Sequence, residues 1–452
     1  MVSGRTAKWQ PMFQFSVLCL LPTSRGFRTV IGRMATNVAT PTRAERQGGR
    51  TSVPKMPISF SDIQAAEDRI RSVVLETPTI PSTSFTRLIG SDVFLKAENL
   101  QRTGSFKIRG AMNAIAQLSD EQKQLGVVAA SAGNHAQGVA LAASELGTAS
   151  TVFMPEAAAI PKVAATMEYG ADVRLGGADL AEATDLGLSF AAETGATMIH
   201  PYDDANIIAG QGTLGIELMA QVPDVDTVVI PVGGGGLISG AAIAIKAIRP
   251  ETRIIGVSSE VVPTYIRARE SGEPIQIASE HTVADGIAVS RPARICFDII
   301  EEHVDELVTV SDRQITEAVA LLLERAKYLV EPSGAAGVAA LLNGAIPDPG
   351  KTAIVLSGGN IDLLFLDSVI RHGLEARGRF ASFSVVVPDE PGHLAEVLNR
   401  VGALGGNVLT VEHHREGTGL EFGAVKITLS IETRSRSHFE QILAALDSYL
   451  VL

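Results

Sequence analysis

The chain has 452 residues, of which 46% are apolar, 19% charged and 5% aromatic, and 43 are glycines. This length suits two or three domains with a large packed core, and the glycines indicate many tight turns. Residues 1–50 hold eight Lys/Arg and one acid, Glu45, so residues 51–452 carry a net charge of −19 against −12 for the whole chain. Such an acidic body argues against nucleic acid or an anionic membrane as a partner.

Residues 1–50 differ from everything that follows, being rich in Arg, Ser and Thr around one apolar run, FQFSVLCLL (Phe13–Leu21). That run is too short to span a bilayer. Three interpretations stay open: a disordered leader (including a start codon placed too early, with Met34 as the true start), an organelle transit peptide, or a secretory signal that lacks a close small-residue cleavage site. We expect a cytoplasmic protein, with an organelle as the alternative if the segment is a transit peptide.

Cysteine usage agrees with a reducing compartment. Cys19 lies in the N-terminal segment, so Cys296 is the single thiol of the body, which therefore cannot form an internal disulfide.

From Ser59 onward, strand-like apolar runs alternate with alanine-rich helical runs. The spacing predicts helices over Ser61–Val74, Phe106–Leu118 and Asn134–Gly147, and strands over Val93–Glu98 and Gly126–Ser131. Further strand-then-turn units follow at Ser150–Pro155, Ala171–Gly177, Thr227–Gly236, Arg253–Ser259 and Thr352–Asn360. Strands alternating with helices predict an α/β fold with parallel sheets covered on both faces.

The pattern changes after about Arg377. A strand, a DEPG turn, a helix and a second strand occupy Phe383–Glu416, an alternating strand follows at Phe422–Thr433, and a helix at His438–Tyr449. This order, with a short last strand at the terminus, predicts a ferredoxin-like βαββαβ module. We expect a leader at 1–50, a catalytic domain at 51–376 and the module at 380–452, with the linker at Arg371–Arg379.

PVGGGGLISG (Pro231–Gly240) follows a strand and opens a helix. Four successive glycines let backbone N–H groups converge at a helix start, which predicts a cradle for a phosphate. The spacing is neither that of a dinucleotide fold nor that of a nucleotide P-loop. A phosphorylated cofactor fits better, although a merely flexible turn is the alternative.

Lys107, in TGSFKIRGA (Thr103–Ala111), stands between two apolar neighbours. A lysine amine forms a Schiff base with an aldehyde, and partial burial lowers its pKa. A solvated helix cation is the ordinary interpretation of any lysine. Together with the phosphate cradle, however, Lys107 favours pyridoxal 5'-phosphate.

Six stretches in order now resemble one family. TGSFKIRGA, SAGNHAQG (Ser131–Gly138), PVGGGGLISG, ADGIAV (Ala284–Val289), EPSGAAG (Glu331–Gly337) and SGGN (Ser357–Asn360) are similar to the fold type II pyridoxal-phosphate enzymes, above all the threonine dehydratase (threonine ammonia-lyase) and serine racemase/dehydratase group. The resemblance runs from Ser59 to Leu374 and implies two parallel-sheet subdomains. It also implies a lyase that converts L-threonine to 2-oxobutanoate and ammonia, with L-serine to pyruvate as a side activity.

The resemblance implies roles for particular residues. Lys107 would carry the cofactor and then serve as the base for the α-proton, Phe106 would pack on the pyridine ring, and Asn134 would bind the ring hydroxyl. Ser357 would face the pyridine nitrogen, where a serine, unlike an aspartate, does not force ring protonation and so favours β-elimination. The phosphate would be held by Gly233, Gly234, Gly235, Gly236 and Leu237, and the substrate carboxylate by the backbone of Ser131, Ala132, Gly133, Asn134 and His135.

Two positions differ from those of close relatives in the family, and the differences bear on which reaction and which cofactors are expected. Serine racemases of the family carry a serine where this chain has Ala132, and a methyl group cannot return a proton, so elimination is favoured. Where the family places a metal-binding acid, this chain has Ser258, with Glu260 two residues on, so no metal is expected. A serine or 3-hydroxyaspartate dehydratase/racemase, or a catalytically inactive amino-acid sensor, remain the alternatives.

Other reactive residues have ordinary explanations. His135 would orient its loop or face the substrate carboxylate, Cys296 would be a buried apolar residue, and Glu331 would line the pocket or start a helix. The adjacent His413 and His414 would point to opposite faces of a strand, which disfavours a metal pair.

The C-terminal module, through PDEPGHLAEVLNRVGALGGNV (Pro388–Val408), resembles an ACT domain. That resemblance implies allosteric binding of an amino acid such as isoleucine or valine near Gly392 and the Gly405–Gly406 pair, in a homodimer or tetramer. A dimerisation module that binds nothing is the alternative.

Overall fold

The computed structural model describes residues 57–278, 280–415 and 420–451, and the predictions for residues 1–50 lie outside this part of the chain. The first helix, α2 (Phe60–Ile70), begins with a capping box: the Asp62 N–H donates to the Ser59 hydroxyl and the Ser59 N–H to the Asp62 carboxylate. The prediction of a helix over Ser61–Val74 was therefore displaced, because the N-cap is Ser59 and not Ser61.

A six-stranded sheet is the larger of two mainly parallel sheets, with the order β1-β2-β10-β7-β8-β9. Its neighbours are parallel except at the edge, where β1 runs antiparallel to β2. All residues of β7 and β10 are buried, as expected for strands covered on both faces. The strands are β1 (Thr79–Pro81), β2 (Val93–Lys96), β7 (Thr227–Pro231), β8 (Arg253–Ser259), β9 (Glu306–Val310) and β10 (Thr352–Val355).

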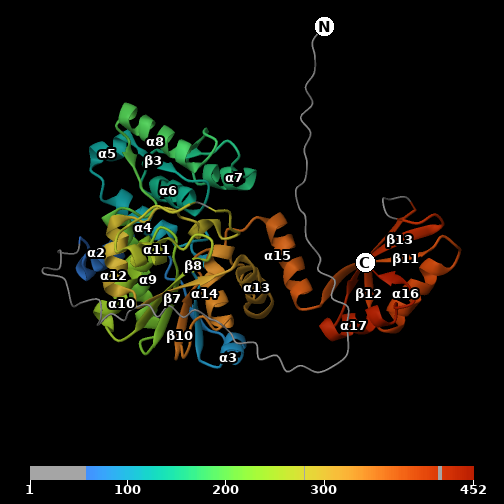
Figure 1. Cartoon of the computed structure of the whole chain (residues 1–452). Coiled ribbons are helices and arrows are strands. Elements are labelled where there is room, and N and C mark those ends of the chain that lie inside the picture. The colour runs from blue at the N-terminus through green and yellow to red at the C-terminus, as the bar shows by residue number, and fades with distance from the viewer. Residues whose placement is uncertain (1–56, 279, 416–419, 452) are drawn as a thin grey trace, which may run out of the picture. The chain divides into compact units, whose positions relative to one another are not determined.

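Two hydrophobic cores lie on opposite faces of this sheet, since Val228 and Ile230 join one core and Val229 the other. Figure 1 shows the corresponding helix layers on either side of β7 and β8. One core is filled mainly from α2, α9 (Ala205–Gln221), α10 (Gly236–Ile248), α11 (Thr264–Ser271) and α12 (Arg294–His303). The other is filled from α3 (Thr83–Ile89), α13 (Asp312–Leu321), the π-helical turn Leu322–Ala326, α14 (Pro332–Leu342) and α15 (Leu363–Ala376).

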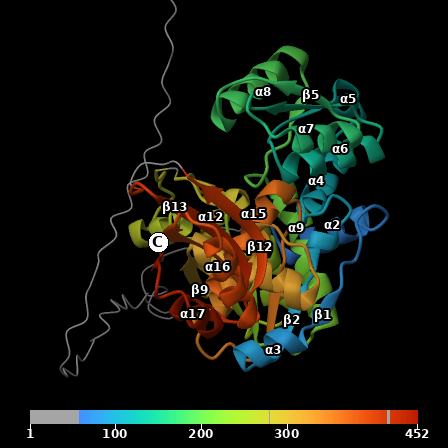
Figure 2. The ribbon, with the colours of Figure 1, turned by 90° about the vertical axis from the view of Figure 1, so that its right-hand side faces the viewer.

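The smaller sheet is wholly parallel, with the order β5-β4-β3-β6. Its strands are β3 (Val127–Ala130), β4 (Ser150–Met154), β5 (Asp172–Leu175) and β6 (Thr197–Met198). Figure 2 shows helices gathered around it; they are α4 (Lys107–Ala116), α5 (Asp120–Leu125), α6 (Asn134–Glu145), α7 (Ile160–Glu168) and α8 (Leu180–Thr194). Val127 and Val128 point into different cores, so this sheet is also covered on both faces.

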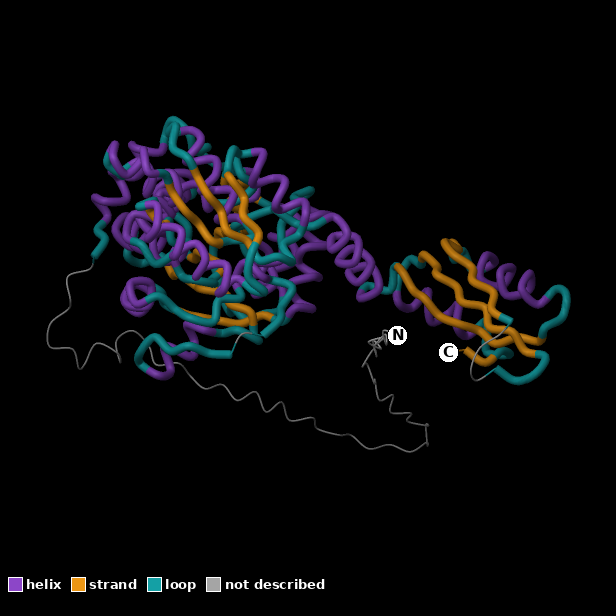
Figure 3. The backbone as a smooth tube through the Cα atoms, turned by 90° about the horizontal axis from the view of Figure 1, so that it is seen from above, coloured by secondary structure: helices purple, strands orange, loops and turns teal. Residues whose placement is uncertain are grey.

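The C-terminal elements form a four-stranded antiparallel sheet with the order β12-β13-β11-β14. In chain order they are β11 (Phe380–Pro388), α16 (His393–Ala403), β12 (Asn407–His414), β13 (Ala424–Glu432), α17 (Arg436–Ala444) and β14 (Leu450–Val451). This is the βαββαβ order that the sequence predicts, and Figure 3 shows the strands side by side with helices beside them. Alternate residues of β13 are buried against the two helices.

The predicted linker at Arg371–Arg379 is wrong for its first six residues, because α15 runs to Ala376. Arg371 forms an ion pair with Asp367 one helical turn earlier, which supports the helix there. In the described part of the chain no helix is long and apolar enough to cross a membrane.

Candidate active site

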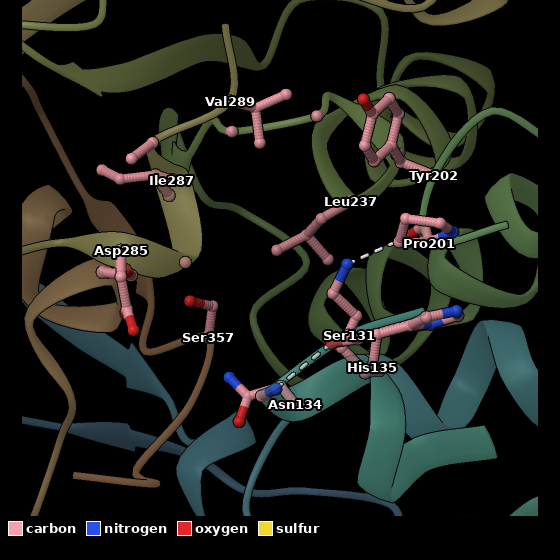
Figure 4. Close-up of a pocket in the computed structure, with 18 of the residues that line it drawn as sticks. Ser131, Asn134, His135, Pro201, Tyr202, Leu237, Asp285, Ile287, Val289 and Ser357 are labelled. Carbon is pink, nitrogen blue, oxygen red and sulfur yellow. Dashed lines mark hydrogen bonds between the residues drawn. The ribbon is translucent and has the colours of Figure 1, made fainter. Parts of the chain in front are cut away.

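A cavity of about 330 Å³ is lined by residues from the regions of both parallel sheets. Figure 4 shows part of it, with Asn134 and Ser357 near one another and Pro201 and Tyr202 across from them. Every residue predicted for the cofactor and the substrate lines this cavity: Phe106, Lys107, Ser131, Ala132, Gly133, Asn134, His135, Gly233, Gly234, Gly235, Gly236, Leu237 and Ser357. The structure thus brings the residues together, and their individual roles stay predictions.

Lys107 is the first residue of α4 and is half-buried in the cavity wall, unlike a solvated helix cation. Its Nζ atom donates a hydrogen bond to the Pro201 carbonyl at 3.0 Å. Burial lowers the pKa of Lys107 to about 8, because the charged ammonium loses its water. A sizeable fraction of the amine is therefore neutral near physiological pH, as a nucleophilic lysine requires.

The position of Lys107 depends on the close approach of the α4 and α6 backbones. A Cβ atom at Gly138 of α6 would come within 3.1 Å of the Lys107 carbonyl carbon, so only glycine lets α6 pack this closely on α4. The Phe106 N–H donates to the Ser357 carbonyl at 3.1 Å, which joins the start of α4 to the loop after β10. These contacts hold the lysine and the Ser357 loop on the same cavity.

The tetraglycine turn joins β7 to α10 and presents only backbone to the cavity. A Cβ atom at Gly234 would lie 2.2 Å from Cδ1 of Tyr202, and one at Gly233 would lie 2.8 Å from Cα of Ile287. Gly235 has φ +90°, a conformation that other residues rarely adopt. The turn therefore requires glycine, and its N–H groups stand at the start of a 13-residue helix.

The Ser131–His135 loop leads into the N-terminus of α6. The Gly133 N–H donates to the Ser131 hydroxyl at 3.2 Å, and no side chain caps α6, which leaves its first N–H groups free of an internal partner. His135 is buried with Nε2 2.8 Å from the Ile199 carbonyl. Burial, assisted by the nearby Lys107 charge, lowers the pKa of His135 to about 3. The ring is therefore neutral at ordinary pH, and its hydrogen bond to Ile199 agrees with the predicted part in orienting the loop.

Several cavity residues were not singled out from the sequence. Pro201 and Tyr202 contact the lysine and the tetraglycine turn, as described above, and Lys162 of α7 pairs with Asp285 at 3.1 Å. The ADGIAV stretch that contains Asp285 was noticed without a role for that residue. The HPYDD stretch around Tyr202 carries no spacing signal that would have found it.

A buried charge network lies beneath the start of α4. Arg109, two residues after Lys107, donates twice to Glu98 at 2.8 Å and twice to Glu217 at 2.6 and 2.8 Å. Lys96 donates to Glu217 at 2.7 Å, and the side chains of Lys96, Glu98 and Arg109 are fully buried. The network joins α4 to α9 and to the segment after β2.

Cys296, His413 and His414 were expected to have no catalytic or metal-binding role. Burial raises the pKa of the Cys296 thiol to about 12, so it is not a nucleophile. His413 and His414 both lie on exposed positions of β12. Among the residues that the structure describes, no group of three or more His, Cys, Asp or Glu side chains could hold a metal ion.

The cavity fits a phosphorylated aldehyde cofactor. The glycine-only cradle would accept the phosphate, and Lys107 has a low pKa as a condensing amine needs. The buried Ser333 hydroxyl in the cavity wall has no hydrogen-bond partner among the residues that the structure describes. Nothing in this set of side chains resembles a nucleotide or metal site. The arrangement therefore agrees with the cofactor that the sequence predicts.

Comparison with known proteins gives consistent results. Residues 70–358 match the family described as pyridoxal-phosphate dependent enzyme. The chain is 46% identical over 385 residues to the L-threonine ammonia-lyase of Thermotoga maritima, covering 85% of this chain and 96% of that protein. It is 44% identical over 311 residues to the catabolic L-threonine dehydratase of Escherichia coli K12, covering 68% and 94%.

Solved structures agree at the level of fold. Maize serine racemase has a TM-score of 0.67 and 37% identity, covering 71% of this chain and 98% of that one. The processed form of threonine deaminase isoform 2 from Solanum lycopersicum has a TM-score of 0.67 and 34% identity, covering 69% and 92%. With the family matched over more than half of its length, this chain belongs to the pyridoxal-phosphate dependent enzymes.

Proposed function

We propose that the protein is an L-threonine ammonia-lyase, converting L-threonine to 2-oxobutanoate and ammonia. The observation that carries the proposal is the placement of Lys107 in one cavity with the tetraglycine turn and Ser357. The proposal is supported by the relatives of that name, which match most of the chain.

Each cavity residue has a part in this proposal. Pyridoxal phosphate, when bound, supplies an aldehyde for the amino group and an electron-withdrawing ring for the bond-breaking at the α-carbon. The backbone of Gly233–Gly236 with Leu237 would hold its phosphate, Phe106 would pack on its ring, and Ser357 would face its pyridine nitrogen. Asn134 would donate to the ring hydroxyl.

The chain's own groups would bind the substrate and move its proton. The backbone of Ser131–His135, where the first N–H groups of α6 have no partner within the helix, would hold the substrate carboxylate. Lys107 Nζ, once released from the cofactor, would take the α-proton, and its lowered pKa suits a base working near neutral pH. Loss of that proton and of the β-hydroxyl amounts to loss of water, and hydrolysis of the remaining C–N bond gives the keto acid and ammonia.

The residues near the proposed site for the substrate carboxylate favour elimination over racemisation. Ala132 lines the cavity and its methyl group cannot donate a proton. His135 is held neutral by burial and bonded to Ile199. Neither residue could return a proton to the α-carbon from the side opposite Lys107.

Keto-acid formation from threonine, serine and 3-hydroxyaspartate tests the proposal. We expect threonine to give the highest kcat/KM, with serine slower, and Lys107→Ala to abolish turnover together with any visible absorbance that borohydride removes. Full turnover by Lys107→Ala would refute the mechanism. Preference for 3-hydroxyaspartate, or net formation of D-serine, would favour the serine or 3-hydroxyaspartate dehydratase/racemase alternative.

We further propose that the C-terminal sheet binds an amino-acid effector. A cavity of about 240 Å³ lies there, lined by Gly392, His393, His413 and Arg415, with Arg415 paired to Asp389 at 3.2 Å. Gly405 and Gly406, which were predicted to lie near the ligand, do not line it, since Gly406 packs on Val401 and Ile442 instead. A cationic and an anionic side chain together suit the two charges of an amino acid.

Isoleucine and valine are the probes for this second site. We expect either to change the KM for threonine, and Arg415→Ala to remove that response while kcat without effector is unchanged. If neither amino acid alters activity or binds in calorimetry, the module has only an assembly role.

A further inference from the structure

The orientation of the Asn134 amide is fixed by a directional chain of hydrogen bonds. The Asn360 amide nitrogen donates to the Thr103 carbonyl at 2.7 Å, and a backbone carbonyl can only accept. The same nitrogen donates to Asn134 Oδ1 at 2.9 Å, which is closer than its third acceptor, Gln137 Oε1, at 3.2 Å. Because its oxygen is thus directed at Asn360, the Asn134 amide must turn its nitrogen the other way.

Glu331 is the acceptor at the far end of this chain. Asn134 Nδ2 donates to Glu331 Oε1 at 2.7 Å, which uses one of its two N–H groups. Both residues line the cavity. The second N–H of Asn134 is the one that the proposed function assigns to the ring hydroxyl of the cofactor.

We propose that Glu331 is a positioning residue for the cofactor: by accepting one N–H of Asn134 it presents the other to the cofactor's ring hydroxyl. The inference rests on the proposed role of Asn134 at that hydroxyl. Glu331 begins α14 but makes no capping hydrogen bond with its side chain, so the carboxyl group is directed to Asn134 rather than to its own helix.

Packing leaves Glu331 and Asn360 little freedom to move. A Cβ atom at Gly358 would come within 2.1 Å of Glu331 Oε1, and one at Gly104 within 2.4 Å of Asn360 Oδ1. The Glu331 N–H also donates to the Gly358 carbonyl at 3.0 Å. Two glycines thus let the backbone close around the chain of amides, which restricts the rotamers of both side chains.

The charges that face Glu331 come from three other elements. The pKa of Glu331 is raised to about 8, chiefly by burial and also by Asp285 of the ADGIAV stretch, while the Asn134 hydrogen bond, Lys162 of α7 and Lys107 of α4 act in the opposite direction. At pH 7 the group is therefore mostly a neutral acid, with Oε1 as acceptor. Ionisation above pH 8 places a negative charge beside the site for the ring hydroxyl and weakens binding of an anionic cofactor there.

Binding of pyridoxal phosphate to the apoenzyme tests this, with no amino-acid substrate present. Glu331→Gln keeps an oxygen acceptor of the same reach, so we expect its dissociation constant at pH 7 to stay within about twofold of wild type. Glu331→Ala removes the acceptor, and we expect about 5- to 10-fold weaker binding, the effect of one hydrogen bond. Between pH 7 and 9 wild-type affinity should fall relative to that of Glu331→Gln, because only wild type gains a charge.

A double-mutant cycle with Asn134→Ala separates positioning from general structure. If Glu331 acts through Asn134, Glu331→Ala adds no further loss of affinity in the Asn134→Ala background. Asn113→Ala is the matched control: Asn113 is a buried amide on α4 that donates to the Asn206 carbonyl at 2.7 Å and does not line the cavity, so it should lower thermal stability and leave cofactor affinity unchanged.

Three results would each overturn the inference. The losses of affinity from Glu331→Ala and Asn134→Ala could be additive, or Glu331→Gln could weaken binding as much as Glu331→Ala. The ratio of the wild-type affinity to the Glu331→Gln affinity could also stay constant with pH. If circular dichroism shows that Glu331→Ala does not fold, the comparison of Glu331→Gln with wild type across pH remains as the test. Since these readouts use no threonine, a chain that fails to deaminate threonine refutes the proposed function without deciding this inference.

Discussion

Replacing Arg109 by leucine tests whether the charge network below α4 stabilises the fold. The substitution removes four hydrogen bonds to Glu98 and Glu217 and leaves Glu98 with no exposed surface and only Lys96 as a nearby cation. Breaking one partner of a buried ion pair costs about 3–5 kcal/mol of unfolding free energy. We expect a loss in this range, because the guanidinium is fully buried and no water can replace it.

The pH dependence of that loss follows from Glu98. Burial alone would raise the pKa of Glu98, but Arg109 and the hydrogen bonds outweigh it and the pKa is lowered. In wild type this stabilisation is present above the ordinary carboxyl pKa and is lost as pH falls through the lowered value. Without Arg109 burial raises the pKa instead, so the variant should regain stability relative to wild type as pH falls towards the ordinary carboxyl pKa of about 4.3.

Urea unfolding followed by far-ultraviolet circular dichroism measures these free energies, since the single tryptophan, Trp9, lies outside the described residues. Arg109→Leu with Glu98→Gln is the matched control: neutralising the stranded carboxylate should recover about 2 kcal/mol. A loss below about 1 kcal/mol for Arg109→Leu, or no recovery in the double variant, would refute the reasoning.

Three further predictions concern the cavity. Gly234→Ala would place a Cβ 2.2 Å from the Tyr202 ring, and we expect overpacking of about 1–3 kcal/mol with weaker cofactor binding by equilibrium dialysis. Gly402→Ala in α16, which meets no atom within 4 Å, should leave cofactor binding unchanged and should not lower stability. Because the pKa of Lys107 is about 8, about a tenth of its amine is uncharged at pH 7. The rate at which apoenzyme condenses with pyridoxal phosphate should therefore rise up to about pH 8 and then level off. A rate that still rises steeply at pH 10 would indicate a lysine with an ordinary pKa. If Ala132 lies opposite Lys107, as the resemblance implies, Ala132→Ser supplies a hydroxyl there, and chiral chromatography should detect D-serine formed from L-serine. Unchanged product would mean that the residue does not face the α-carbon.

Much of the cavity could be predicted from the sequence because its parts lie in a few conspicuous local patterns. The glycines at Gly233–Gly236 and the lysine at Lys107 belong to turns at strand ends or helix starts, where local rules hold. The order of strands and helices likewise predicted covered parallel sheets, and both parallel sheets are found. Local pattern was sufficient wherever one segment contains the whole feature.

What could not be predicted depends on contacts between distant segments. Tyr202 follows β6, a strand of only two residues that leaves no periodic signal, and its importance comes from packing on Gly234. The Lys162–Asp285 pair joins residues 123 positions apart. The pKa of Glu331 is likewise set by residues on four other elements, so its protonation state cannot be obtained from the EPSG stretch alone.

The cavity is built from segments that lie far apart in the sequence. The supply of the vitamin from which the cofactor is made should therefore affect the lifetime of the protein in the cell. Lys107 and Ser357 stand at opposite ends of the catalytic sequence, and no single segment supplies both the amine and the phosphate cradle. The unfolded chain therefore lacks the assembled site, and the cofactor is expected to bind the native state far more tightly than the unfolded one. At a free concentration one hundred times its dissociation constant, such a ligand adds about 2.7 kcal/mol to the unfolding free energy. A cell short of the vitamin from which the cofactor is made would lose enzyme molecules to proteolysis as well as losing their activity.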